Sequence, residues 1–170
     1  MSAKESEPEI FEITLKHGLV KVTLLPKVAP KHVERIVKLT REGLYNNVAF
    51  HRVIDGFMAQ TGDVEFGNIK TGWNKARAGT GGSNDSNIPA EFSKLPFDRG
   101  ALGMARAQDP NSANSQFFIM LDDGHFLNNQ YTLFGNVTEG MEFVDKIMKG
   151  DQSNNGSVDD PDFMLKVEVK

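Results

Sequence analysis

The chain has 170 residues, 39% of them hydrophobic, which suits one domain with a sizeable core. Its formal net charge of −4 argues against general binding to nucleic acids or anionic membranes, which requires a basic face. The absence of cysteine excludes disulfides, a thiolate nucleophile and cysteine-ligated metals. The acidic N-terminus has no apolar signal-like segment, and no apolar run approaches the ~20 residues of a membrane span. We therefore expect a cytoplasmic protein.

The first part of the chain predicts a tail followed by a hairpin. Residues 1–8 are polar and are expected to form a disordered tail, with residues 9–170 forming a single domain. Apolar and polar residues then alternate on both sides of the turn signal His17-Gly18. This alternation is typical of an antiparallel hairpin with one buried face.

Two segments have the periodicity of amphipathic helices. The first has apolar residues on one face from Val33 to Thr40, and Gly43 follows as a C-terminal stop. The second covers residues 139–149, with a stripe of Met141, Val144, Ile147 and Met148. Strand-like runs lie at 50–54, 57–61, 100–105, 116–121, 131–137 and 163–169.

Many short amphipathic strands with two helices favour one antiparallel β-barrel. Strands at both chain ends alternate strongly and need partners, and closing a barrel removes exposed edges. An α+β sandwich is the competing fold. Residues 63–99 form a long, Gly-, Asn- and Ser-rich loop, and a loop of this length in a compact domain is usually functional.

The segment Phe50–Gly62 has an unusual composition for a hairpin. The turn signal Asp55-Gly56 joins two short strand-like runs, and Arg52 and Gln60 stand among large apolar residues. A fully buried strand face would exclude Arg52, whereas a solvent-exposed face would exclude Phe57 and Met58, which follow the turn. A ligand groove with an apolar floor and one fixed cation needs both kinds of residue.

Two registers of this hairpin are compatible with the sequence. A two-residue turn places Arg52 opposite Ala59 and leaves Gln60 on the other face. A three-residue loop, Asp55-Gly56-Phe57, pairs Arg52 with Gln60 on one face. A functional Arg52–Gln60 pair requires the second register or a bulge with the same effect.

Other chemical sites find little support. The histidines are not spaced for a shared metal, and the acidic loop 151–162 lacks the calcium-loop pattern. The glycine run Gly79–Gly82 lacks the remaining signature of a nucleotide loop, and no triad of nucleophilic catalysis is recognisable. We interpret the glycines as allowing tight backbone close to a ligand, and we expect neither metal nor cofactor.

In the run that begins at Gln116, strand alternation places Gln116 and Phe118 on one face and Phe117 and Ile119 on the other. If the second face is core, Gln116 and Phe118 point outward together. Phe126-Leu127 adds apolar surface beyond an Asp-Asp-Gly turn. Taken alone, each aromatic residue fits a core position better than a ligand wall.

Together these segments resemble the cyclophilin family. Phe50–Asp63 is similar to that family's most characteristic segment, and Gly79–Gly82 matches its glycine loop. The further motifs follow in the expected order: Met104–Ala107, Ser115–Ile119, Phe126-Leu127, Phe134–Val137 and Gly140-Met141. The resemblance covers residues 10–169, and several ordered motifs are far more specific than any one of them.

The resemblance implies a mainly β fold, a closed eight-stranded antiparallel β-barrel capped by two α-helices. It also implies peptidyl-prolyl cis–trans isomerase activity without a cofactor, acting on proline-containing peptides and on unfolded or folding proteins. We expect a monomer. By motif matching, Arg52 is the central catalytic residue with Gln60 beside it, and the substrate contacts come from Phe57, Met58, Gly79, Ala105, Arg106, Ala107, Gln116, Phe118, Phe126, Leu127 and Tyr131.

Three residues depart from the pattern of eukaryotic members and resemble the bacterial branch. Arg106 stands where many eukaryotic members have asparagine, Phe126 replaces the usual tryptophan, and Tyr131 replaces the usual histidine. Because that tryptophan takes part in cyclosporin binding, we expect weakened affinity for cyclosporin. The catalytic arginine is retained.

Two rival functions remain open from the sequence. A binding module or chaperone would hold proline-containing segments in the same groove, with incidental turnover. The presence of both Arg52 and Gln60 favours the enzyme, because binding without catalysis requires only the apolar pocket. A small-ligand barrel of the lipocalin type needs a hollow interior, whereas the many apolar residues at inward positions indicate a filled one.

Overall fold

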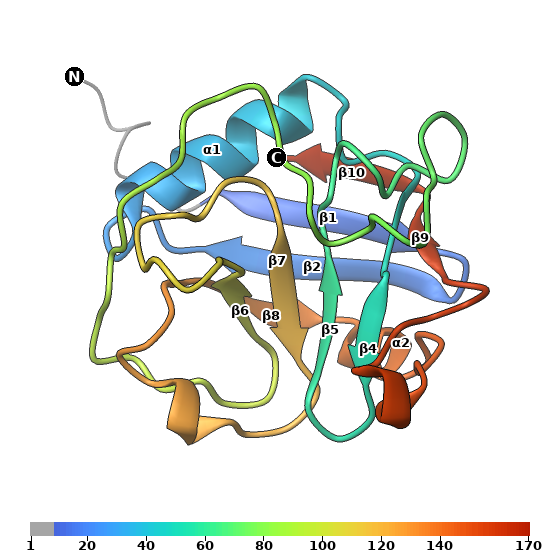
Figure 1. The fold of residues 1–170 in the computed structure, drawn as a ribbon. Coiled ribbons are helices and arrows are strands. Elements are labelled where there is room, and N and C mark those ends of the chain that lie inside the picture. Colours follow the sequence, from blue (N-terminus) through green and yellow to red (C-terminus); the bar gives the residue numbers. More distant parts are fainter. Residues whose placement is uncertain (1–8) are drawn as a thin grey trace.

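An eight-stranded antiparallel sheet dominates the computed structural model, which describes residues 9–170 (Figure 1). Its strands are β1 (Ile10–Leu15), β2 (Gly18–Leu24), β4 (Arg52–Ile54), β5 (Met58–Thr61), β6 (Ala101–Met104), β7 (Phe117–Met120), β8 (Leu133–Glu139) and β10 (Lys166–Val169). They are ordered β10-β1-β2-β8-β6-β7-β5-β4. The predicted tail, residues 1–8, lies outside the described residues.

The two ends of the curled sheet are joined by a second, two-stranded ladder. β3 (Val48–Ala49) pairs with β9 (Phe163–Met164). Because β3 leads into β4 and β9 leads into β10, this ladder connects the neighbourhoods of the two end strands. The Phe50 N–H extends it by donating to the carbonyl of Asp162 at 2.8 Å. The predicted eight antiparallel strands are confirmed, but the closure runs through the β3–β9 ladder and not through pairing of β4 with β10.

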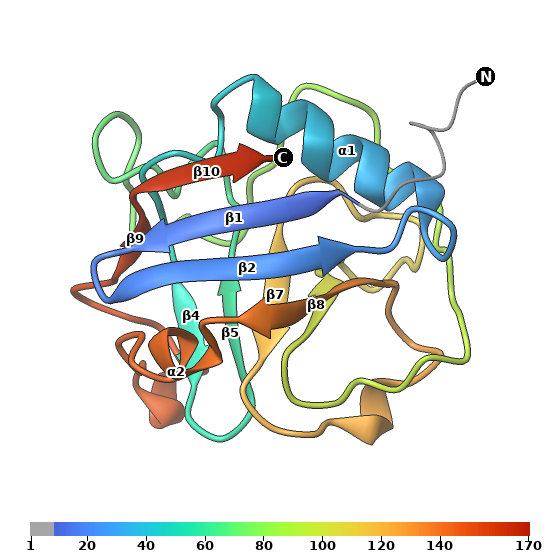
Figure 2. The same cartoon turned by 180° about the vertical axis from the view of Figure 1, so that it is seen from behind.

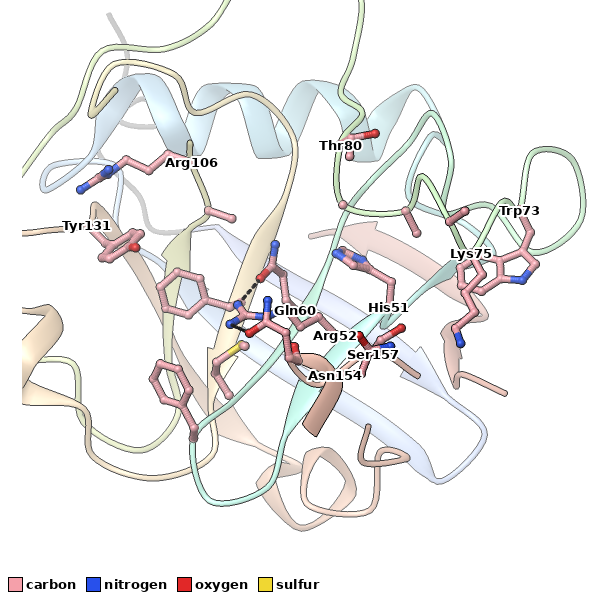
Figure 3. Close-up of a pocket in the computed structure, with 18 of the residues that line it drawn as sticks. His51, Arg52, Gln60, Trp73, Lys75, Thr80, Arg106, Tyr131, Asn154 and Ser157 are labelled. Carbon is pink, nitrogen blue, oxygen red and sulfur yellow. Dashed lines mark hydrogen bonds between the residues drawn. The ribbon is translucent and has the colours of Figure 1, made fainter. Parts of the chain in front are cut away.

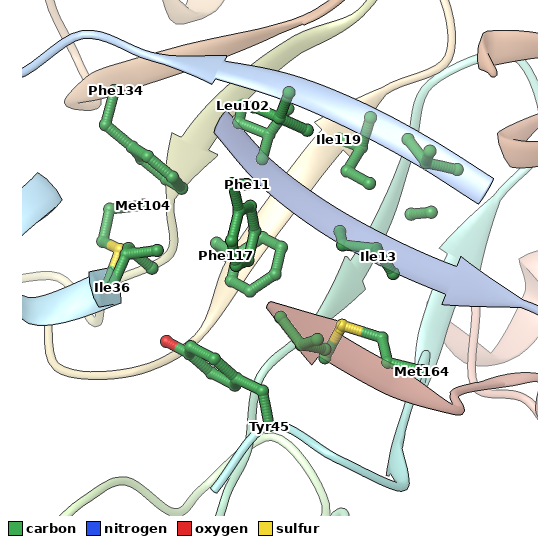
Figure 4. Close-up of a cluster of buried hydrophobic side chains, with 14 of the residues drawn as sticks. Phe11, Ile13, Ile36, Tyr45, Leu102, Met104, Phe117, Ile119, Phe134 and Met164 are labelled. Atoms are coloured by element: carbon green, nitrogen blue, oxygen red, sulfur yellow. The ribbon is translucent and has the colours of Figure 1, made fainter. Parts of the chain in front are cut away.

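The interior of the curled sheet is filled with side chains. The Phe117 ring packs edge-on against Phe11, Tyr45 and Phe134, with ring centroids 5.8, 5.5 and 6.0 Å away (Figure 4). The buried Tyr45 hydroxyl donates to the Ser115 carbonyl at 2.7 Å, which satisfies the polar end of the ring. This filled core contradicts the hollow interior that a lipocalin-type barrel requires.

Helix α1 (Pro30–Arg41) lies across one end of the sheet (Figures 1 and 2). Its apolar face is buried as predicted, from Val33 to Thr40. Gly43 adopts a φ of +75° just beyond the helix, a conformation that suits glycine at a helix end. No helix within residues 9–170 is long and apolar enough to cross a membrane.

The second predicted helix, 139–149, is shorter than expected. Helix α2 covers Met141–Val144 only, and the chain continues in turns. The backbone N–H of Met148 donates to the Asp162 carboxylate at 2.8 Å, and that of Gly150 to the Val53 carbonyl at 2.8 Å. These long-range bonds replace the helical ones, and Met148, predicted on the buried stripe, is 47% exposed.

The last predicted strand, 163–169, is interrupted at Leu165, which is 41% exposed instead of sharing the face of Val167. The chain changes partner at this residue, because β9 pairs with β3 whereas β10 pairs with β1.

Two short 3₁₀ helices, η2 (His125–Leu127) and η3 (Gln152–Asn154), lie in loops beside the site described next.

Candidate active site

The β4–β5 hairpin adopts the register that pairs Arg52 with Gln60 and Ile54 with Met58. Its loop therefore has three residues, Asp55-Gly56-Phe57, and Gly56 at a φ of +75° makes the turn. The second of the two registers left open by the sequence is the correct one. Arg52 and Gln60 consequently share one face of the sheet.

The Arg52 guanidinium is held from two sides. Its Nη1 donates to Gln60 Oε1 at 3.1 Å, within the cleft drawn in Figure 3. On the other side, its Nε donates to the Asn155 carbonyl and its Nη2 to Asn155 Oδ1, each at 3.0 Å. Burial lowers the pKa of Arg52 from its ordinary value, but an arginine keeps its charge in proteins.

Gln60 is itself oriented by a chain of hydrogen bonds. Its Nε2 donates to Gln116 Oε1 at 3.0 Å, and Gln116 Nε2 donates to the carbonyl of Gly81 at 2.9 Å. Because the Gln60 amide nitrogen is engaged by Gln116, its oxygen faces Arg52. The glycine loop, the residue that precedes β7, and strands β5 and β4 are therefore linked by one chain of hydrogen bonds that ends at the guanidinium.

Beside Arg52 lies an apolar hollow lined by Phe57, Met58, Phe118, Leu127 and Tyr131. The Phe118 ring is fixed on two sides, stacked on Phe97 at 5.9 Å and edge-on to Tyr131 at 5.6 Å. Met58, Phe118 and Leu127 are almost completely buried. Rings and chains held in this way form a preshaped apolar wall rather than a surface that must be ordered on binding.

The hollow belongs to a pocket of about 830 Å³, and a second groove of about 680 Å³ adjoins it. The two share Gln60, Gly79, Thr80, Ala105 and Arg106. Of the site residues predicted from the sequence, Arg52, Gln60, Phe57, Met58, Gly79, Ala105, Arg106, Phe118, Leu127 and Tyr131 line the pocket, and Ala107 and Gln116 line the groove.

Phe126 is the one predicted contact that lines neither cavity. It is 71% exposed, and its ring lies 5.5 Å from that of Phe57 at the rim.

Arg106 lines both cavities, but its guanidinium is centred 4.6 Å from the Tyr131 ring and donates to the Gln130 carbonyl at 2.6 Å. The Arg106 charge is thus held on the outer side of Tyr131.

Sequence reasoning missed the lining residues contributed by loops: His51, Trp73, Lys75, Ala76, Ala78, Thr80, Asn154, Asn155 and Ser157. Asn155 has a φ of +57° and is followed by Gly156, so an Asn-Gly turn signal was present. Nothing in the sequence connected that turn to Arg52. Burial lowers the pKa of His51 to about 4, so this side chain is neutral at physiological pH.

In the part of the chain that the structure describes, one group of side chains has the spacing of metal ligands: Asp98, Asp123 and His125. All three are exposed, and none of them lines the pocket or the groove. His125 Nε2 lies 2.6 Å from Asp98 Oδ1, which raises the His125 pKa.

A curled antiparallel sheet that carries a fixed guanidinium beside an apolar hollow defines a small β-protein with a peptide-sized cleft. The chain belongs to the cyclophilins: the family model described as "Cyclophilin type peptidyl-prolyl cis-trans isomerase/CLD" matches residues 10–169. It is a peptidyl-prolyl cis–trans isomerase, as the sequence analysis predicted.

The relatives include bacterial proteins. A probable peptidyl-prolyl cis–trans isomerase of Brucella suis is 60% identical over 170 residues, covering 99% of this chain and 87% of the relative. Peptidyl-prolyl cis–trans isomerase B of Escherichia coli is 40% identical over 139 residues, covering 77% and 79%. A cyclophilin type isomerase of Cryptosporidium parvum, solved in the presence of the dipeptide Ala-Pro, superposes with a TM-score of 0.79 at 27% identity, covering 95% and 98%.

Proposed function

We propose that the isomerase reaction takes place at Arg52, with Gln60 and Asn155 holding its guanidinium. The proline ring of the substrate occupies the apolar hollow of Phe57, Met58, Phe118, Leu127 and Tyr131. The observation that carries this proposal is the placement of one charged, hydrogen-bonded guanidinium at the edge of a preshaped apolar hollow. Ring and cation are then held side by side.

The reaction rotates an X-Pro amide, whose barrier is ~18–20 kcal/mol and whose uncatalysed exchange takes tens to hundreds of seconds. No covalent bond is broken, so the reaction calls for no nucleophile or general base. Amide resonance is lost in the twisted transition state, and the prolyl nitrogen regains its lone pair. A donor aimed at that nitrogen stabilises the twisted form over either planar form, which is the differential binding that catalysis requires.

Arg52 suits this role because a guanidinium has five N–H groups in a rigid fork. Within residues 9–170, Gln60 accepts one of these hydrogen bonds and Asn155 accepts two. The remaining two N–H groups are free to meet the prolyl nitrogen and a neighbouring substrate carbonyl. Lowering the barrier by ~7 kcal/mol gives a rate gain on the order of 10⁵.

The rest of the substrate chain has room on both sides of the hollow. We place the residues that precede proline in the adjoining groove, against Ala105–Ala107, Gln116 and the glycine loop at Gly79. The Ala105 N–H already bonds to the Gln116 carbonyl, which holds the wall of this groove in place. With the ring and the preceding chain held, the carbonyl before proline is the part that swings.

We further propose that the natural substrates are proline-containing segments of unfolded or folding proteins, since the pocket and the adjoining groove together leave room for an extended chain around the proline. The presence of Ala-Pro with the related Cryptosporidium protein supports a proline-containing ligand. Cyclosporin affinity is expected to be weak, because the exposed Phe126 offers no N–H donor where many family members have a tryptophan.

The test is the cis–trans exchange rate of a short Ala-Pro peptide, measured by NMR exchange with the native protein and with Arg52→Ala. The native protein is expected to accelerate exchange, and Arg52→Ala to lose most of this acceleration while remaining folded. A folded Arg52→Ala protein with full turnover would overturn the assignment. Peptide binding without acceleration by the native protein would favour the binding module instead.

A further inference from the structure

The long loop after β5 is an ordered part of the site. The carboxylate of Asp63, which is completely buried, accepts hydrogen bonds from the N–H groups of Glu65 and Phe66 through one oxygen, and from those of Gly79 and Gly81 through the other. Both ends of segment 64–78 are therefore tied to a single side chain. This anchoring gives the loop a defined position beside the pocket.

The loop forms the wall of the pocket that lies on the far side of Arg52 from the apolar hollow. Trp73 and Lys75 lie on one side of Arg52, whereas Arg106 and Tyr131 lie on the other (Figure 3). Lys75 and Trp73 line the pocket but not the adjoining groove. The pocket thus continues past Arg52 in a direction that the groove does not take.

The charged side chains that line this pocket are all cationic, although the protein as a whole is acidic. They are Arg52, Lys75 and Arg106, and no aspartate or glutamate of the described chain is among the lining residues. The guanidinium of Arg52 is bound to Gln60 and Asn155, and that of Arg106 is turned onto Tyr131. His51 contributes no charge because burial keeps it neutral.

Lys75 has a carboxylate partner that a substrate can replace. Its ammonium forms an ion pair with Asp159, whose side chain is 86% exposed. Exposed ion pairs of this kind contribute little, because both groups are well solvated apart. Asp159 does not line the pocket, so a carboxylate arriving through the cleft can exchange with it at the pocket face of Lys75.

We propose that Trp73 and Lys75 form a subsite for the residue that follows proline, and that this subsite prefers an acidic side chain. The direction rests on the function proposed above, in which the preceding residues occupy the groove. The chain that leaves the hollow then runs toward the wall formed by segment 64–78. The half-buried Trp73 ring packs against the aliphatic part of a glutamate, and Lys75 meets its carboxylate.

The experiment compares three peptides, Ala-Ala-Pro-Glu-Ala, Ala-Ala-Pro-Gln-Ala and Ala-Glu-Pro-Gln-Ala, by NMR exchange. Each is measured with the native protein, Lys75→Gln, Asp159→Asn and the charge-matched control Lys27→Gln. Lys27 is exposed and lines neither cavity. The readout is the ratio of catalytic efficiencies for Glu over Gln after proline, which is independent of the overall activity of each variant.

We expect a ratio of about two- to fivefold for the native protein and for Lys27→Gln, falling with added salt. The ratio should drop to about one in Lys75→Gln and rise in Asp159→Asn, because the internal competitor is gone. The sole tryptophan, Trp73, should also change its fluorescence when the Glu peptide is added. A ratio near one in the native protein, or the same ratio in Lys75→Gln, would overturn the subsite.

A Lys75-dependent preference for glutamate before proline would equally overturn the proposal, because it would reverse the direction of the chain. The peptide Ala-Ala-Pro-Gln-Ala distinguishes a failure of the subsite from a failure of the proposed catalytic site. If the native protein accelerates its exchange but shows no charge preference, the subsite fails and the isomerase assignment stands. If it accelerates none of the peptides, the proposed catalytic site fails with it.

Discussion

Arg52 and Gln60 face each other across the β4–β5 ladder, with Arg52 Nη1 donating to Gln60 Oε1 at 3.1 Å. Neighbouring strands hold directly opposed residues at a nearly constant separation, so this contact is built into the backbone. A slip of one residue would send Gln60 to the other face. The orientation of the guanidinium therefore depends on the three-residue loop Asp55-Gly56-Phe57.

Arg52→Lys is expected to lower turnover about a hundredfold while keeping the positive charge. A lysine ammonium is a compact point charge and cannot bond Gln60, Asn155 and the substrate in one plane. Loss of one preorganised transition-state donor typically costs ~10²–10³ in rate. The measurement is the exchange rate of an Ala-Pro peptide at saturating enzyme. A fully active Arg52→Lys protein would show that charge alone is sufficient.

Asn155→Gly tests how far the C-terminal loop positions Arg52. Glycine accepts the φ of +57° and keeps the carbonyl that binds Arg52 Nε, so only the Oδ1 contact is lost. A hydrogen bond to a charged group contributes ~1.5 kcal/mol, so kcat should fall about tenfold with little change in KM. Gln152, three residues before Asn155, is exposed and lines neither cavity, so the control Gln152→Ala should match the native protein. An unchanged kcat in Asn155→Gly would show that Gln60 and the backbone carbonyl of residue 155 orient Arg52 without the Oδ1 contact.

Short-range patterns predicted the strands and α1 well, because alternation and helical periodicity record which face is buried. Val33, predicted on the apolar face of the first helix, is in the core, and so is Phe11, one of the alternating apolar residues of the first hairpin. The predictions failed where contacts with distant segments of the chain determine the backbone conformation. Helix α2 stops early because Met148 bonds to Asp162, and the last strand breaks at Leu165 because it changes partner. Local sequence contains no record of such long-range bonds.

The residues of the candidate site fall into the same two groups: those that local sequence predicts and those that distant contacts place. Arg52, Gln60 and Phe118 lie on neighbouring strands whose motifs are recognisable in the sequence. Asn155 and Lys75 reach the cleft from loops, and their positions depend on turns whose partners are far away in the chain. Loop residues of this kind become candidates only after the fold has placed them.

Gly103→Ala should disturb the apolar hollow. A Cβ at this position would lie 2.4 Å from the Phe118 ring and 2.6 Å from the Phe97 ring, closer than packed atoms approach. The stacked pair must shift, and overpacking of this kind costs about 1–3 kcal/mol. We expect a lower midpoint of denaturant unfolding and reduced turnover. A second substitution, Phe97→Leu, should restore part of the turnover by giving Phe118 room. Normal turnover in Gly103→Ala would mean that the ring position is unimportant.

His51 should make the protein less stable as the pH falls from about 6.5 to 4. Burial lowers its pKa from 6.5 to about 4, so in this range the unfolded chain binds a proton that the folded chain does not. The free energy of unfolding therefore decreases with falling pH, by about 3 kcal/mol at pH 4, whereas above pH 6.5 the effect is absent. Carboxylates begin to titrate at the lower end of this window, so the contribution of His51 is the difference between the native protein and a His51 variant. His51→Gln should show a shallower decline in chemical unfolding measured at each pH, and identical slopes would contradict this assignment.

Asp63→Asn should loosen the loop that carries Trp73 and Lys75. The two carboxylate oxygens of Asp63 together accept four backbone N–H groups at 2.8–3.0 Å. An asparagine has one acceptor oxygen, so two of these N–H groups would face an amide nitrogen that cannot accept their hydrogen bonds. Each buried donor without a partner costs about 1–3 kcal/mol, and two such donors would be left at this site.

Amide hydrogen exchange should therefore accelerate throughout segment 64–81 in Asp63→Asn, and the free energy of unfolding should fall by about 3 kcal/mol. Glu65→Gln is the matched control, because among residues 9–170 its exposed carboxylate accepts a hydrogen bond only from the Gly82 N–H, at 3.4 Å. Retained protection of the loop in Asp63→Asn would indicate that the packing of Arg77 over Phe66, at 4.2 Å, holds it instead. Loosening the loop should also reduce any preference for glutamate after proline, because Lys75 would no longer be held beside the cleft.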